Sequence, residues 1–237
     1  MRKFIIIICV LNIFPFLEPN QSFAEIRPRK EYEKTGQVFW EAHTTDKKVA
    51  ITFDDGPNSI YTPIVLEVLN EYDAKATFFV VGNMVEKHPD IVSNIVYNGH
   101  ELGNHTFSHA YGQSVSEEEL LEEIEKTNSI LQLVIGSRPS YFRPVGGYYS
   151  DEVIDSAVQL NHKVLLWSWH QDPKDWSDQK AAQIANHVTQ NIRPGDVILL
   201  HDGGGNRMET VLALKLILPI LKDEGYRFVT ASELFAE

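Results

Sequence analysis

Residues 49–57 read VAITFDDGP, an apolar run that ends in two adjacent aspartates, Asp54 and Asp55. The run Val49–Phe53 is short and rich in β-branched residues, which predicts a buried strand. The Gly-Pro pair that follows turns the chain. Both carboxylates are therefore expected at the carboxyl end of this strand, although the motif taken alone is more often only a turn.

Short apolar runs and longer amphipathic stretches alternate along the rest of the chain. Predicted strands cover residues 37–40, 49–53, 76–81, 102–104, 141–142, 163–167, 197–200 and 227–229. Predicted helices cover residues 62–72, 88–98, 116–134, 151–160, 179–191 and 208–224. The third of these helices opens with the sequence SEEE from Ser116, which is the signature of a capping box.

Repeated strand-then-helix units indicate parallel strands covered by helices. The strands are apolar throughout, as in sheets that are buried on both faces. We therefore expect an α/β fold, specifically an incomplete or distorted (β/α) barrel of about seven parallel strands. A doubly wound open sheet is the alternative. In both folds, functional residues gather at the carboxyl ends of the strands.

Ionisable residues follow five of the predicted strands, and the fold would bring them to one rim. They are Asp54 and Asp55, His105, Arg143, Asp175, and His201 with Asp202. Five separate segments would thus deliver charge to one end of the sheet, where chance placement would scatter it.

His105 and His109 have the spacing H-x-x-x-H. On a helical turn, residues i and i+4 share a face, so both imidazoles could reach one ion. For the pair alone, two unrelated histidines are an equally good interpretation. With one carboxylate from the first strand, the set leaves coordination positions open for water and substrate, which favours a catalytic metal site over a structural one.

Two further loops combine residue types that suit ligand binding. Arg143 opens the run RPVGG, whose glycines allow the backbone to approach a ligand. A Pro-Gly loop with a salt-bridged arginine fits that run equally well. The run WSWHQDPKDW at 167–176 places tryptophans among carboxylates. Aromatic faces suit sugar rings, although most tryptophans are simply core residues.

The N-terminus has the features of a secretory signal. Arg2 and Lys3 precede an apolar run at 4–17, and Ser22-Phe23-Ala24 is a small-x-small cleavage pattern. We expect a signal peptide at 1–24, a charged, solvated leader at 25–36 and one catalytic domain at 37–237. The protein would then be secreted or associated with the cell wall. An uncleaved anchor is the alternative, but the run is short against the ~20 residues that span a bilayer.

Composition excludes several classes of function. The chain has 237 residues, of which 43% are hydrophobic and 23% charged, and this is an ordinary globular composition. A net charge of −12 argues against a nucleic-acid partner. The single cysteine, Cys9, lies within the predicted signal peptide, so cysteine nucleophiles and cysteine-bound metals are excluded from the mature protein. No sequence feature indicates an oligomer.

Five motifs occur in a fixed order: TFDDGP at 52–57, HTFSH at 105–109, RPVGG at 143–147, DPKDW at 172–176 and LLH at 199–201. Together they resemble the polysaccharide deacetylase family, the NodB-like carbohydrate esterases. The resemblance extends over about residues 37–234, and its first two motifs are the most specific.

The resemblance implies a metal site and two proton-transferring groups. Asp55, His105 and His109 would bind one divalent cation, most commonly zinc, with cobalt, nickel or iron as alternatives. Asp54 would be the general base that takes a proton from water. His201 would be the general acid that protonates the leaving amine.

The resemblance also implies supporting roles around these groups. Arg143 would hold Asp54 in place, and Asp175 would orient His201. Trp176 and Leu199 would wall the pocket for the acetyl methyl group. The backbone N–H of Gly146 would stabilise the oxyanion.

The third motif departs from the usual family pattern, which is closer to Arg-Pro-Pro-aromatic-Gly. Val145 and Gly146 replace the second proline and the aromatic residue. A glycine can still supply a backbone donor, but without the aromatic side chain the groove wall must differ.

The expected function is therefore a secreted, metal-dependent hydrolase that removes N-acetyl groups from N-acetylglucosamine-type polymers, such as peptidoglycan or chitin-like oligomers. Its partner would be an acetylated polysaccharide, and it would meet a membrane only transiently, through the signal peptide. The alternatives are an O-acetyl esterase acting on a polysaccharide and a carbohydrate-binding protein that has lost catalysis. An Fe(II) oxygenase would leave Asp54 and His201 without a role.

Overall fold

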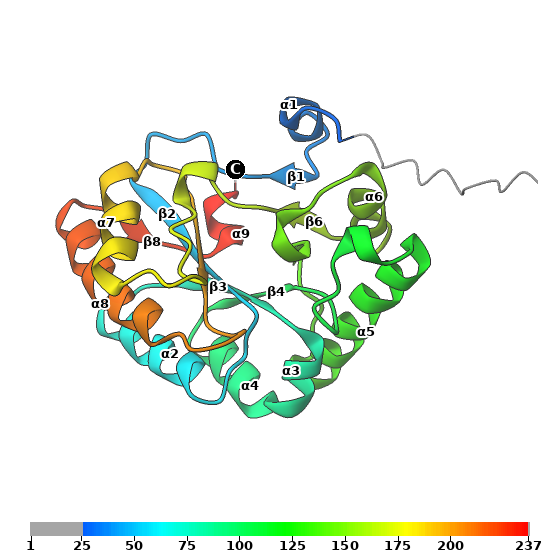
Figure 1. Ribbon diagram of the computed structural model, residues 1–237, viewed down its shortest axis with the longest axis horizontal. Coiled ribbons are helices and arrows are strands. Elements are labelled where there is room, and N and C mark those ends of the chain that lie inside the picture. Colours follow the sequence, from blue (N-terminus) through cyan, green and yellow to red (C-terminus); the bar gives the residue numbers. More distant parts are fainter. Residues whose placement is uncertain (1–25, 237) are drawn as a thin grey trace, which may run out of the picture.

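The computed structural model describes residues 26–236. Helices surround a curled sheet (Figure 1), whose strands follow the order β1-β6-β5-β4-β3-β2-β7, while β8 pairs with β2. Every pair of neighbouring strands is parallel. The predicted α/β fold, an incomplete barrel of about seven parallel strands, is confirmed.

The strands are β1 (Val38–Phe39), β2 (Lys48–Asp54), β3 (Ala76–Val80), β4 (Glu101–Asn104), β5 (Tyr141–Phe142), β6 (Lys163–Leu165), β7 (Val197–His201) and β8 (Arg227–Phe228). The helices are α1 (Arg29–Glu33), α2 (Tyr61–Glu71), α3 (Gly82–Lys87), α4 (Pro89–Tyr97), α5 (Glu117–Ile135), α6 (Asp151–Gln159), α7 (Ala181–Asn191), α8 (Met208–Asp223) and α9 (Ala231–Leu234). Short 3₁₀ turns are η1 (Gly112–Ser114), η2 (Val145–Gly147) and η3 (Trp169–Gln171). Within residues 26–236, no helix is both long and apolar enough to cross a membrane.

Strand β2 lies inside the sheet and is buried from its second residue to its last. Phe53 stacks on Phe78 of β3, with 5.0 Å between the ring centroids. The register of the parallel pair β2–β7 places Asp54 opposite His201. Two ionisable groups that are distant in the sequence therefore meet at the same end of the sheet.

Helix α5 begins and ends where its sequence predicts. Ser116 caps the helix: its hydroxyl oxygen accepts from Glu119 N, and the Glu119 carboxylate accepts from Ser116 N, which completes the capping box. Gly136 ends the helix in the left-handed conformation (φ 75°), which glycine adopts without a steric cost.

Three stretches differ from the sequence prediction. One of them is α9, which was not predicted. The helix predicted at 88–98 is present as α4, but α3 directly before it was not predicted. Pro89 disfavours helical backbone at the preceding residue, and His88 (φ −136°) accordingly separates the two helices. The leader expected to be solvated contains α1, in which Tyr32 is fully buried and packs edge-on against Tyr149. One aromatic residue in a charged stretch carries no periodicity, so this packing leaves no pattern in the sequence.

The signal peptide predicted at 1–24 lies outside the described residues.

Candidate active site

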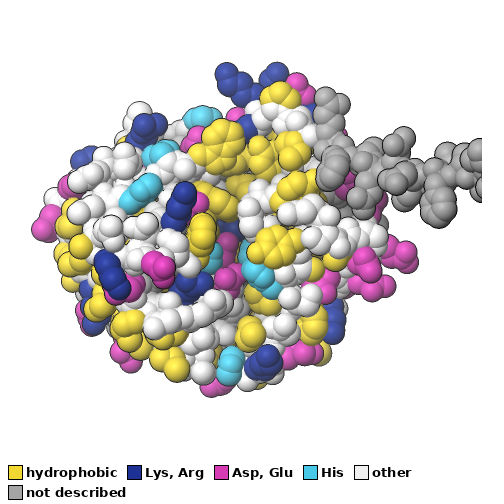
Figure 2. Space-filling view, viewed as in Figure 1, with side chains coloured by type: hydrophobic (Ala, Val, Ile, Leu, Met, Phe, Trp, Pro, Cys, Tyr) yellow, Lys and Arg dark blue, Asp and Glu magenta, His cyan; other side chains and the backbone are white. Residues whose placement is uncertain are grey.

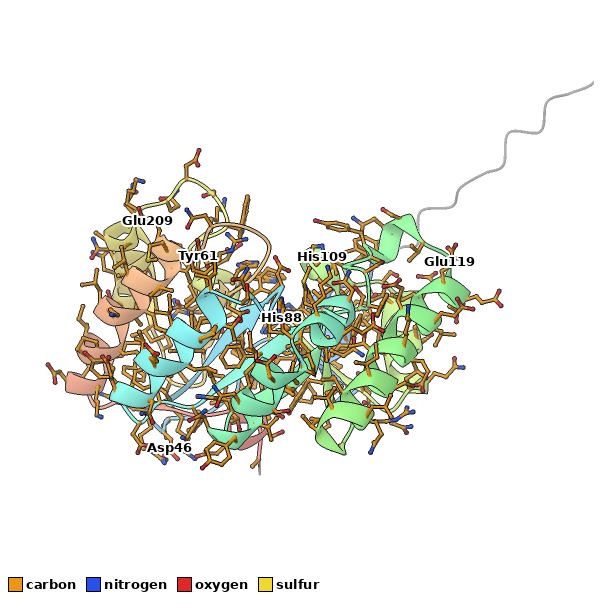
Figure 3. The ribbon with its side chains drawn as sticks, turned by 90° about the horizontal axis from the view of Figure 1, so that it is seen from below. Asp46, Tyr61, His88, His109, Glu119 and Glu209 are labelled. Carbon is orange, nitrogen blue, oxygen red and sulfur yellow. The ribbon has the colours of Figure 1, made fainter. Side chains whose placement is uncertain are left out.

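The carboxyl ends of the strands surround one cavity. In Figure 3, His109 lies far from Asp46, which stands in the loop before β2. The histidine is therefore near the opposite end of the sheet from that loop. The cavity has a volume of about 340 Å³. Figure 2 shows a hollow in which histidine and acidic side chains lie, rimmed by hydrophobic ones. Of the predicted site residues, Arg143 and Asp175 lie behind the cavity, and the others line it.

Asp55, His105 and His109 converge within the cavity. His109 Nε2 lies 2.9 Å from Asp55 Oδ1, and His105 Nε2 lies 3.5 Å from the same oxygen. One ligand atom from each residue lies within 4.8 Å of the others, and no second group of this kind occurs in residues 26–236. Two imidazoles and one carboxylate suit a divalent transition metal with open coordination positions.

Hydrogen bonding prepares His105 to act as a ligand. Its Nδ1 lies 2.7 Å from the carbonyl oxygen of Arg143. This contact is best made by a protonated Nδ1, which leaves the lone pair of Nε2 free for an ion. The imidazole is almost completely buried, so its orientation is fixed by packing as well.

The pKa shifts of Asp55 and His105 show that the cluster stabilises an ionised carboxylate with a positive charge beside it. Burial alone would raise the pKa of Asp55, but hydrogen bonds from His105 and His109 outweigh it and hold that pKa well below its usual range. Burial alone would lower the pKa of His105, but the carboxylates of Asp54 and Asp55 raise it. A divalent cation would supply the positive charge that this arrangement stabilises.

The two histidines do not lie on a helical turn, and that expectation is wrong. They belong to the loop after β4, in which Thr106 (φ 66°) and His109 (φ 64°) have left-handed backbone. The H-x-x-x-H spacing is satisfied by a tight loop instead. Such backbone is costly for residues other than glycine, so the surrounding structure must hold it.

Polar side chains hold this loop from its base and from α5. Asn104 Oδ1 accepts from Thr106 N at 2.9 Å, and Asn104 Nδ2 donates to Asn128 Oδ1. The Glu123 carboxylate accepts from the backbone N–H groups of Phe107 (2.9 Å) and Ser108 (2.6 Å). In the sequence, Glu123 resembles any other residue on the solvated face of a helix, so its contacts could not be predicted.

Asp54 is bound from behind by Arg143. The Nη1 of Arg143 donates to Asp54 Oδ1 at 2.8 Å and to Thr52 Oγ1 at 2.8 Å. Its Nε and Nη2 donate to the carbonyl oxygens of Leu165 (2.9 Å) and Leu166 (2.8 Å). Burial lowers the pKa of Arg143, and the Asp54 carboxylate opposes that shift. The guanidinium therefore ties β2, β5 and β6 together and orients one carboxylate.

Asp175 binds His201 through two contacts. Its Oδ1 lies 2.8 Å from His201 Nδ1, and its Oδ2 accepts from His201 N at 2.9 Å. Thr210 Oγ1 donates to Oδ2 as well, at 2.8 Å. Burial alone would lower the pKa of His201, but the hydrogen bond to Asp175 outweighs it and raises the pKa. Within the described residues, His201 Nε2 has no hydrogen-bond partner.

The remaining predicted residues also line the cavity. Gly146 has left-handed backbone (φ 65°), which its missing side chain permits. Trp176 is 54% exposed, whereas Leu199 is buried in β7. Three cavity residues were not predicted, namely Tyr111, Trp167 and Asp172. Trp167 and Asp172 stand in the tryptophan-rich run, but residue type alone did not separate them from core and turn residues.

Asp202 and Gly203 pack against the backbone of Asp54 and Asp55. Asp202 N donates to the carbonyl oxygen of Asp54 at 3.1 Å, and its buried carboxylate accepts from Thr62 Oγ1. Burial raises the pKa of Asp202 to about 7. A Cβ atom on Gly203 would lie 2.0 Å from the carbonyl oxygen of Asp55. The glycine run that begins here resembles a flexible loop in the sequence, but its first glycine is required for close packing.

The chain matches the family model described as polysaccharide deacetylase over residues 41–165. It is 48% identical over 206 residues to a peptidoglycan-N-acetylglucosamine deacetylase of Bacillus cereus, which covers 87% of this chain and 96% of the relative.

Solved structures with a similar fold include one with a bound compound and one with a bound metal ion. The first is the Bc1960 peptidoglycan N-acetylglucosamine deacetylase in complex with 4-naphthalen-1-yl-N-oxidanyl-benzamide, with a TM-score of 0.83, 38% identity and coverage of 88% of this chain and 97% of that one. The second is a family 4 acetyl xylan esterase from Clostridium thermocellum in complex with a cobalt ion, with a TM-score of 0.73, 37% identity and coverage of 80% and 90%.

Proposed function

The chain belongs to the polysaccharide deacetylase family, and we propose that it hydrolyses the N-acetyl groups of N-acetylglucosamine residues in peptidoglycan. One observation carries the proposal: a carboxylate held by an arginine, an Asp-His-His cluster and a histidine held by an aspartate line the same cavity. Amide hydrolysis needs water to be activated and the leaving amine to be protonated, and this set can do both.

Peptidoglycan is favoured over chitin-like oligomers by the names of the relatives. The Bacillus cereus relative and Bc1960 are both peptidoglycan N-acetylglucosamine deacetylases. We propose that the chain is secreted or associated with the cell wall, because residues 1–24 have the features of a signal peptide. An enzyme that modifies peptidoglycan must reach the wall.

We propose that Asp55, His105 and His109 hold one divalent cation, with zinc as the first choice. The geometry fits, since one nitrogen of each imidazole lies within 3.5 Å of the same carboxylate oxygen. Such a cation lowers the pKa of a bound water to about 7 and polarises a carbonyl oxygen. The similar acetyl xylan esterase was solved with cobalt, and cobalt, nickel and iron remain alternatives here.

Asp54 is the general base in this proposal. Its Oδ1 is occupied by Arg143, while Oδ2 lies on the side of His105, at 3.9 Å from Nε2. Oδ2 takes a proton from the attacking water as the water oxygen bonds to the acetyl carbon. The negative charge that develops on the carbonyl oxygen is stabilised by the backbone N–H of Gly146.

His201 is the general acid in this proposal. With Nδ1 bound to Asp175, its Nε2 carries a proton when the ring is charged, and the raised pKa favours the charged form. Nε2 gives that proton to the amide nitrogen as the C–N bond breaks. The products are acetate and the free amine of the sugar. Trp176 and Leu199 enclose the acetyl methyl group, which keeps the carbonyl in reach of the attacking water.

An O-acetyl esterase activity is the second candidate, and the similarity to an acetyl xylan esterase favours it. The same base and cation would cleave an ester. An alkoxide leaves more readily than an unprotonated nitrogen, which would have to depart as an amide anion, so ester cleavage would depend less on His201.

Acetate release from three substrates tests the proposal. The zinc-loaded protein is incubated with purified peptidoglycan, with N-acetylglucosamine oligomers and with acetylated xylan, each with and without a chelator. We expect the fastest release from peptidoglycan, abolished by the chelator and restored by zinc. Release from acetylated xylan alone would instead establish the esterase. No release from any substrate by the metal-loaded protein would refute both activities.

A further inference from the structure

Tyr111 lies beside the proposed metal ligands but has no role in the proposed chemistry. It follows His109 by two residues, and its ring packs edge-on against the His109 ring, with 5.6 Å between the centroids and an interplanar angle of 80°. The side chain is 46% exposed and lines the cavity. Within the described residues, its hydroxyl makes no hydrogen bond to protein. A half-exposed aromatic residue with a free hydroxyl is well suited to contact a ligand.

The ring lies against the glycine that interrupts the third motif. A Cβ atom on Gly146 would lie 3.1 Å from Tyr111 Cε1 and 3.6 Å from Cδ1. A side chain at position 146 and the present position of Tyr111 therefore compete for the same space. The family resemblance implies an aromatic side chain at position 146, where this chain has glycine, and the structure has the Tyr111 ring beside that position.

The backbone around Tyr111 is fixed by its neighbours. Its carbonyl oxygen accepts from Ser114 N at 2.8 Å, which closes the turn η1. A Cβ atom on Gly112 would lie 2.7 Å from Val153 Cγ2, so the loop is packed tightly against α6. The backbone that carries the ring is thus fixed before any ligand binds, which lowers the entropic cost of binding.

Aromatic groups also line other parts of this cavity. Trp167 and Trp176, which come from the loop after β6, are among its lining residues. The ring of Tyr111 and the two indoles together give a cavity of about 340 Å³ an aromatic lining from two separate loops. Flat apolar rings of this kind match the C–H faces of pyranose rings, while the tyrosine hydroxyl can bond to a sugar hydroxyl.

We propose that Tyr111 is a specificity-determining residue that stacks on a sugar ring of the glycan and supplies the groove wall that Gly146 lacks. This proposal rests on the proposed function for the class of substrate, an N-acetylglucosamine polymer. The ring acts by holding the glycan and takes no part in proton transfer. Its loss should weaken glycan binding and leave the chemical step nearly unchanged.

The test compares Y111A and Y111F with the wild type and with Y97A, in which a tyrosine on α4 that is 88% exposed is removed. Calorimetry with the N-acetylglucosamine pentamer gives Kd, and acetate release gives KM and kcat. We expect Y111A to raise Kd and KM about tenfold, which corresponds to ~1.4 kcal/mol, with kcat changed less than threefold. We expect Y111F, which keeps the stacking ring and loses only the hydroxyl, to raise Kd and KM less than Y111A does, and Y97A to stay within twofold of the wild type.

Two outcomes would overturn the proposal. One is an unchanged Kd in Y111A. The other is a loss of bound metal in Y111A together with full recovery of Kd and KM in excess zinc, because Tyr111 would then act only by packing on His109. The binding arm separates this proposal from the proposed function. A wild type that binds the pentamer without releasing acetate would refute the function alone, and a weaker Kd in Y111A would still support the groove wall.

Discussion

Arg143 and Asp54 form a buried ion pair in which Nη1 donates to Oδ1 at 2.8 Å, with the side chains 0% and 5% exposed. Every guanidinium nitrogen also donates to a protein oxygen, so the arginine is fixed in one orientation. A planar group with several donors in a rigid fork makes this possible, and lysine cannot reproduce it. The position of the proposed base therefore depends on a residue that does not line the cavity.

Replacement of Arg143 by lysine tests this dependence. R143K should lower kcat/KM for acetate release at least tenfold, because a base displaced by about 1 Å loses much of its effect. Bound zinc should persist, since the carbonyl oxygen of residue 143 can still accept from His105. Thermal melting shows whether the variant is folded. R138K, at an exposed ion pair with Glu125, is the matched control and should match the wild type. A folded, metal-bound R143K with full activity would contradict the positioning role.

The Asp175–His201 contact predicts the direction of a pH shift. The hydrogen bond to Asp175 raises the pKa of His201, so the charged acid persists to higher pH. Activity that needs this proton falls as pH rises through that pKa. In D175N the carboxylate is lost and the pKa of His201 falls, so the alkaline limb of kcat against pH should move to lower pH. D178N, on the exposed part of the same loop, should leave the limb in place. An unmoved limb in D175N would show that another group supplies the proton.

Removal of the Glu123 carboxylate should weaken metal binding, although Glu123 lies outside the cavity. Its carboxylate accepts from Phe107 N, Ser108 N and Ser108 Oγ, all between the two histidines. E123A should raise the zinc Kd about tenfold, at the lower end of the range for groups that orient ligands. Competition with a chromogenic chelator gives this Kd. E122A, the exposed neighbour on α5, is the control. Equal zinc affinities in the two variants would mean that the loop holds its shape without Glu123.

A side chain at position 203 should destabilise the fold for steric reasons. A Cβ atom there would lie 2.0 Å from the Asp55 carbonyl oxygen, and no flexible side chain can yield to relieve the contact. G203A should lower the free energy of unfolding by at least ~2 kcal/mol. G36A places a Cβ atom in open space at a left-handed residue (φ 67°), so its cost of ~1 kcal/mol reflects backbone strain alone. Urea denaturation measures both. A G203A variant no less stable than G36A would contradict the close packing.

The fold could be predicted from the sequence because its main signals are local. Apolar runs with turn residues behind them gave the strands, and the capping box at Ser116 gave the start of α5. The rim of ionisable residues followed from the rule that parallel strands end on the same side. Helix α3 and the buried Tyr32 could not be predicted in this way, because neither produces a periodic pattern.

The candidate site could be predicted only in part. The motifs identified which residues meet, but the spacing of His105 and His109 was compatible with a helix as well as with the loop that the structure has. The loop depends on contacts with Asn104, which directly precedes it, and with Glu123 of α5, which is distant in the sequence. Neither residue stands in a recognisable sequence pattern. Tyr111 was missed because the sequence does not show that its ring lines the cavity beside Gly146.

In the proposed mechanism, Asp54 acts as the base beside a cation that other residues hold. The most direct test measures acetate release and bound zinc together in wild type, in D54N and in D46N, a control at an exposed residue far from the cavity (Figure 3). We expect D54N to keep its zinc and to lose at least ~10²-fold in kcat, the lower end of what a positioned base contributes, while D46N should match the wild type. A zinc-loaded D54N that releases acetate at the rate of the wild type would show that Asp54 is not the base.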